Sequence, residues 1–147
     1  MSSNVKQDVV SSLRMREKQL NARSSSFGPR MATIVGLLVG AIGISILWAS
    51  GVEFPVYPPP GIIILLAGAL FVGLGRWLWA PGVGALLGLF VTVGFLISPT
   101  GLSNLADDAG TSVAIGQGTQ VIGVVAALIA GVIATRANYR NLARGRP

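Results

Sequence analysis

The sequence predicts an all-α protein, a bundle of four transmembrane helices preceded by a basic amphipathic cytoplasmic helix. Of its 147 residues 52% are hydrophobic and only 11% are charged, whereas soluble proteins average about 25% charged. Its apolar residues gather in four runs, each close to the roughly 20 residues that cross a bilayer. Because these runs use about half the chain, no separate soluble domain is expected. The predicted spans are residues 31–50, 61–80, 82–98 and 119–135.

The segment before the first span, residues 1–30, is expected to form a basic arm. At a period of 3.6 residues one face of this helix carries an apolar stripe with basic residues beside it. The stripe consists of Val5, Val9, Leu13 and Leu20. Such a helix lies on an anionic membrane leaflet, docks on a partner protein, or stays solvated. The sequence SSSFGP at 24–29 predicts a hinge between arm and membrane. The first apolar run is too long for a signal peptide and is expected to remain as a helix.

The positive charges indicate the topology. Of eleven Lys and Arg residues, six precede the first span, four follow the last, and the remaining one is Arg76 between spans two and three. Loops 51–60 and 99–118 carry none. The positive-inside rule therefore places both termini, the Arg76 turn and the basic tail 136–147 in the cytoplasm of a bacterial cell. We expect a multi-pass inner-membrane protein that meets anionic lipid headgroups, with no nucleic-acid partner.

Aromatic residues mark the expected membrane interfaces. Trp77 and Trp79 fit an aromatic belt beside Arg76, and Trp48 fits the outer interface. Arg76 follows span two closely enough for its long side chain to reach the headgroups as an anchor. The alternative is a buried ligand or a specific lipid-phosphate contact at Arg76.

Each predicted span also carries small residues four positions apart. This spacing lets helix backbones approach closely, either within one bundle or against another protein. The candidate packing or partner-interface residues are Gly36, Gly40, Gly84, Gly88, Gly123 and Gly131.

Catalytic chemistry is not expected. The chain has no cysteine or histidine and five acidic residues, none of which lies in a predicted span. Asp107 and Asp108 are the only paired carboxylates; they fit a solvated turn or the cap of a short helix near 102–109, with a cation or a basic partner as alternatives. We therefore expect no catalytic residue, metal or cofactor and see no evident small-molecule substrate. A proton-coupled exporter would need an intramembrane charge, which is missing.

The layout resembles small actinobacterial membrane proteins that accompany large complexes, such as the accessory subunit of mammalian-cell-entry (Mce) type lipid importers. The similar features are the basic arm, the YPPPG loop at 57–61, the GRWLWAPG turn at 75–82 and the arginine tail. The resemblance implies a role beside a lipid-import permease, but carries over no site residue. Accessory subunits of respiratory oxidase supercomplexes share the layout. The sequence thus favours a non-catalytic accessory or scaffolding subunit, with a small homo-oligomeric carrier as the alternative.

Overall fold

The computed structural model describes residues 2–54, 56–98, 101–102, 105 and 110–145, the side chains of 2–3 and 22–26 excepted. Within these ranges the regular structure is entirely helical. The helices are α1 (Ser2–Ala49), α2 (Pro60–Leu74), α3 (Ala80–Ile97) and α4 (Thr111–Arg144).

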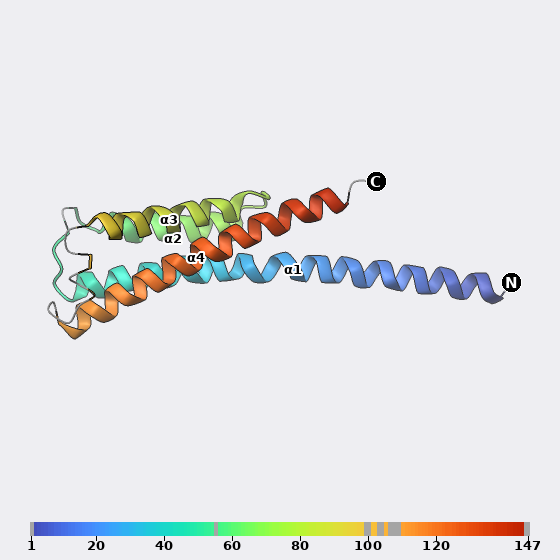
Figure 1. Ribbon diagram of the computed structural model, residues 1–147, viewed down its shortest axis with the longest axis horizontal. Helices are drawn as coiled ribbons and strands as arrows, with labels where there is room; N and C mark the ends of the chain where they lie inside the picture. The colour runs from blue at the N-terminus through green and yellow to red at the C-terminus, as the bar shows by residue number, and fades with distance from the viewer. Residues whose placement is uncertain (1, 55, 99–100, 103–104, 106–109, 146–147) are drawn as a thin grey trace.

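The helices lie side by side, and the N-terminal part of α1 extends far beyond the bundle (Figure 1). That part of α1, the C-terminal part of α4 and the α2–α3 turn all lie toward one end of the molecule, and the other two connections lie at the opposite end. The first of these is the arm end of the molecule, and the second is the loop end. All four helices therefore traverse the bundle once, as alternating passes require.

A small apolar core holds the bundle together. Its fully buried side chains come from three helices: Leu37 of α1, Leu65 and Val72 of α2, and Val124 and Ala127 of α4. From α3, the partly buried residues Leu87 and Val91 pack against this cluster. Most large apolar side chains elsewhere on the helices point outward, so the bundle is apolar outside as well as inside.

Glycines bring α1 and α4 into backbone contact. A Cβ atom added at Gly36 would lie 2.6 Å from the Ala127 nitrogen, and one at Gly123 would lie 2.7 Å from the Gly36 oxygen. A Cβ at Gly43 would overlap the backbone of Gln120. Any side chain at these positions would force the helices apart, so this pair is the tightest in the bundle.

The hinge predicted at 24–29 is wrong, because α1 continues through Pro29 as one helix of 48 residues. A proline inside a helix removes one hydrogen bond and costs about 3 kcal/mol. On its C-terminal side the helix is held by the bundle, and the Thr33 hydroxyl donates to the Pro29 oxygen at 2.9 Å. On its N-terminal side, residues 13–20 (LRMREKQL) are strong helix formers. The helix is already nucleated by the bundle, so it propagates through the proline.

Three described segments are long and apolar enough to cross a membrane: Phe27–Ala49, α3 and α4. The fourth, α2, has 15 residues and a length of about 22 Å. The predicted end of span two at residue 80 is wrong, since Gly75 is extended (φ −65°, ψ 117°) and terminates α2. By contrast, α4 begins and ends well outside the predicted 119–135. The short helix predicted near 102–109, with Asp107 and Asp108, falls mostly outside the described residues.

Candidate functional site

An arginine from α1 caps the C-terminus of α2 at the arm end. Arg30 Nη2 donates to the carbonyl oxygens of Val72 at 2.6 Å and Gly73 at 3.3 Å, and also to that of Gly75; its Nε donates to Val72 at 3.0 Å. These oxygens belong to the last turn of α2, where helical carbonyls lack an intrahelical donor and the helix dipole is negative. The planar guanidinium is suited to this task because it presents several donors at once. Arg30 therefore satisfies carbonyl groups at the C-terminus of α2.

The turn after α2 carries a compact aromatic cluster. The rings of Trp77 and Trp79 stack with centroids 5.5 Å apart and planes 9° apart. Phe71 of α2 lies 5.7 Å from Trp77 and 5.6 Å from Trp79. Arg76 is exposed beside them, and no hydrogen bond or ion pair to it occurs among the described residues. The geometry matches an aromatic group at the edge of the apolar belt; the anchor role of all three residues stays a prediction.

Helix α4 fastens the same turn from its other side. Asn138 Nδ2 donates to the Leu78 oxygen at 2.9 Å. A Cβ added at Gly82 would lie 3.3 Å from the Thr135 hydroxyl oxygen, so the start of α3 also packs closely on α4. Together with Arg30, these contacts join all four helices at the arm end.

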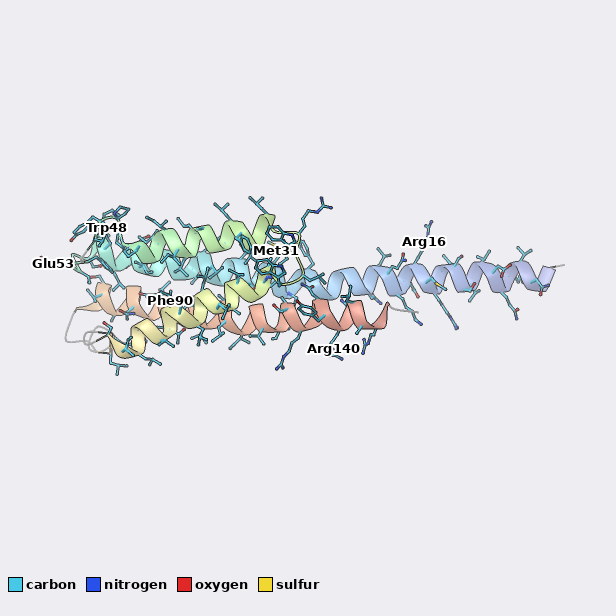
Figure 2. All side chains as sticks on the ribbon, turned by 90° about the horizontal axis from the view of Figure 1, so that it is seen from above. Arg16, Met31, Trp48, Glu53, Phe90 and Arg140 are labelled. Atoms are coloured by element: carbon cyan, nitrogen blue, oxygen red, sulfur yellow. The ribbon has the colours of Figure 1, made fainter. Side chains whose placement is uncertain are left out.

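The arm beyond this junction is free of contacts with the bundle. Val5, Val9, Leu13 and Leu20 are all more than half exposed, and Arg16 lies far out on the same extension (Figure 2). The part of α1 before Pro29 is about 40 Å long. Because α1 continues from the bundle without a break, the arm points away from it rather than folding back. No described residue of the bundle covers its apolar stripe.

A cavity of about 640 Å³ opens at the loop end, with residues of all four helices in its wall. Figure 2 shows α2 and α3 diverging toward this end, where Glu53 and Trp48 lie. The wall is mostly apolar and includes Phe90 and Phe95. Its polar groups include Gln117, which is 5% exposed and donates through Nε2 to Gln120 Oε1 at 3.3 Å. Cavities of this size and mixed lining suit small amphiphilic molecules.

Trp48 lies at the loop end, 45% exposed and with its ring 6.4 Å from that of Tyr57; its role as an interface anchor stays a prediction. The predicted packing glycines all lie at contacts within this chain. Gly36, Gly40 and Gly123 lie between α1 and α4, while Gly88 and Gly131 face α3–α4 contacts. A Cβ added at Gly84 would lie 2.6 Å from Thr33 of α1. These glycines therefore offer no open surface to a second protein.

The described residues contain no group of three side chains suited to holding a metal ion. Among them the acids are widely separated: Asp8 and Glu17 on the arm, and Glu53 at the loop end.

In comparisons with known proteins, no family model, no curated protein and no solved structure matches this chain.

Sequence reasoning missed two features of this site. The first is Arg30, which the sequence analysis treats only as one of the positive charges that indicate topology. Because spans one and two run in opposite directions, a residue just before span one lies at the same height as the end of span two. Gln117 and Gln120 form the second feature. Gln117 lies two positions before the predicted span 119–135 and Gln120 lies inside it, so the predicted boundary separates the two side chains. Within α3, the Thr92 hydroxyl donates to the Gly88 oxygen of its own helix at 2.7 Å.

Proposed function

We propose that this chain is a non-catalytic accessory subunit of a larger bacterial inner-membrane complex, docked through its N-terminal arm. The observation that carries the proposal is the exposed apolar stripe on a helix that projects from the bundle. In a fully solvated helix such a stripe stays in water and adds no stability. An apolar face at helical spacing is the usual recognition element of a helix that binds in a groove of a partner. The stripe is too far from the bundle to be covered by it.

Membrane insertion is supported by the outer surface of the bundle. Leu70, Leu86, Ile97 and Ile122 are each more than 60% exposed, and soluble monomers rarely expose large apolar patches. We assign all four helices as spans. α2 is short for the roughly 30 Å hydrocarbon core, and the Trp77–Trp79 turn extends its reach toward the interface. The arm, the α2–α3 turn and the tail then face the cytoplasm, in accord with the positive-inside rule.

The resemblance to Mce-type accessory subunits makes a lipid importer the first partner to test, and an oxidase supercomplex the second. A non-transporting role is supported by the charge pattern: between Arg30 and Arg136 the described helices carry no acidic or basic side chain, whereas ion and proton pathways in membranes usually contain one. The arm is a binding element, and the bundle is its anchor.

The test is copurification from the native membrane. A C-terminally tagged chain is extracted in mild detergent, and the proteins that accompany it are identified by mass spectrometry. The double variant Val9→Glu with Leu13→Glu should lose the partner complex. Met15→Glu serves as the matched control, because Met15 is 70% exposed and lies on the opposite face of the helix. Recovery of the chain alone from wild-type membranes, in a defined oligomer, contradicts the accessory role.

The cavity at the loop end favours one second candidate, a small homo-oligomeric carrier or lipid-binding protein. The buried Gln117 amide gives that cavity a polar anchoring group within an apolar wall. An autonomous carrier would move its ligand when reconstituted alone into vesicles, and Gln117→Leu would abolish the movement. An accessory subunit would show no activity in that assay.

A further inference from the structure

We infer that the groove between α3 and α4 binds one acyl chain of an anionic phospholipid, with Arg136 holding the lipid phosphate. The groove encloses about 280 Å³ and is walled by Leu86, Leu89, Leu128 and Val132, with Arg136 at its arm end. The inference depends on the membrane placement proposed above, but not on any partner complex.

The floor of the groove is formed by close contact between the two helices. A Cβ added at Gly131 would lie 2.9 Å from Ala85 Cβ and 2.6 Å from the Pro81 oxygen. Farther along, a Cβ at Gly88 would lie 2.6 Å from the Val124 oxygen. The backbones meet at these glycines, so the flanking leucine and valine side chains stand up as two ridges with a channel between them.

The surface of the channel is apolar up to Arg136. Its one hydroxyl, that of Thr135, already donates to the Gly131 oxygen at 2.8 Å. At about 280 Å³, the space is smaller than the roughly 300–1,000 Å³ of pockets that enclose a whole drug-sized ligand. A segment of a hydrocarbon chain fits this space and chemistry.

Arg136 lies at headgroup height in the proposed placement. It follows Thr135, which packs against Gly82, and it precedes Asn138, which bonds the α2–α3 turn at Leu78. The turn also carries the paired tryptophans that mark a membrane interface. A phosphate attached to a chain in the groove would therefore reach the guanidinium, which binds phosphate through two parallel donors.

The charge of Arg136 is available, unlike that of Arg30. The Arg30 guanidinium donates hydrogen bonds to the last carbonyl oxygens of α2. By contrast, no hydrogen bond or ion pair to Arg136 occurs within the described residues. The nearest described acids, Asp8 and Glu17, belong to the projecting arm. An unpaired cation at the end of an apolar channel complements a molecule with an anionic head and an apolar tail, which is the chemistry of an anionic lipid rather than of an apolar helix.

The test is native mass spectrometry of the purified full chain with phosphatidylglycerol or phosphatidylcholine. Wild type should retain one phosphatidylglycerol in preference to phosphatidylcholine. Arg136→Ala should bind phosphatidylglycerol about tenfold more weakly, as expected on removal of a charge-assisted contact. Arg140→Ala is the matched control, because Arg140 is exposed one turn farther along α4 and does not line the groove.

A second pair of variants tests the channel itself. Val132→Trp places an indole in the groove and should displace the bound lipid, whereas Ile133→Trp, on the neighbouring exposed position outside the groove, should retain it. Equal lipid retention by Arg136→Ala and wild type, or by the two tryptophan variants, overturns the inference. A protein dimer that Val132→Trp disrupts would also overturn it, since the occupant would then be a second copy. None of these results bears on the accessory role, because no partner is present.

Discussion

At the scale of single residues, the arm end contains two arginines in different environments. Arg30 is partly buried and bonds three carbonyl oxygens at the end of α2. Arg76 is exposed only a few residues away from those oxygens. Both side chains are positively charged, so the positive-inside rule counts them equally. Their difference comes from geometry: one side chain lies level with a helix C-terminus that lacks donors, and the other lies on the outer surface of the turn.

This difference predicts unequal effects on stability. Arg30→Ala should lower the free energy of unfolding by about 2 kcal/mol or more, because a charged donor is lost from otherwise unpaired carbonyls. Arg76→Ala should change it by less than about 0.5 kcal/mol, as is usual at exposed positions. Thermal unfolding in mild detergent, followed by the fluorescence of Trp77 and Trp79 in the adjacent turn, measures both. Equal effects of the two variants would show that Arg30 does not act as the cap of α2.

At the scale of helices, the pairing of α1 with α4 depends on the absence of side chains at the contact. Gly123→Ala should destabilise the protein by about 1–3 kcal/mol, the usual cost of overpacking, since its Cβ would lie 2.7 Å from the Gly36 oxygen and 2.9 Å from the Gly40 Cα. Gly118→Ala, on the same helix, should be neutral or stabilising by up to about 1 kcal/mol, because the nearest atom is 3.9 Å away. The midpoints of thermal unfolding of the two variants compare them directly; a stable Gly123→Ala protein would contradict the backbone contact.

The continuity of α1 predicts a long distance within one helix. Spin labels at Ser12→Cys and Ile42→Cys, in a chain with no native cysteine, should lie about 45 Å apart, from 30 residues at 1.5 Å each. Double electron–electron resonance in detergent or in nanodiscs measures this distance. A distribution centred well below this value would mean that the chain bends at 24–29 and that the arm lies along the membrane surface.

The sequence predicted the helical class and most of the helix positions, because long apolar runs leave the backbone no alternative to a helix in lipid. It failed where a local signal competed with tertiary structure. Gly28 and Pro29 are strong breaking signals, but the bundle on one side and good helix formers on the other sustain α1 across them. The carbonyl groups at the end of α2 bond Arg30, a residue more than forty positions away in sequence. The apolar pattern of residues 61–80 does not show this contact.

At the scale of the whole molecule, the two ends have separate chemistry. The arm end holds the contacts of Arg30 and Asn138, the tryptophan turn and the basic ends of α1 and α4. The loop end holds a cavity with the buried Gln117 in its wall. In the bundle between them, the glycines Gly36, Gly88 and Gly123 lie at contacts between helices. The central claim of the proposed function is that a partner protein binds the apolar stripe of the arm.

The most direct test of that claim is site-specific photo-crosslinking in intact cells. A photoreactive amino acid replaces Leu13 on the stripe or Met15 on the opposite face, residues that are 57% and 70% exposed respectively. The account predicts a discrete crosslinked product with one membrane-complex protein from position 13 and a much weaker product from position 15. Products of equal strength from both positions, or none from position 13, would contradict the arm as the docking element.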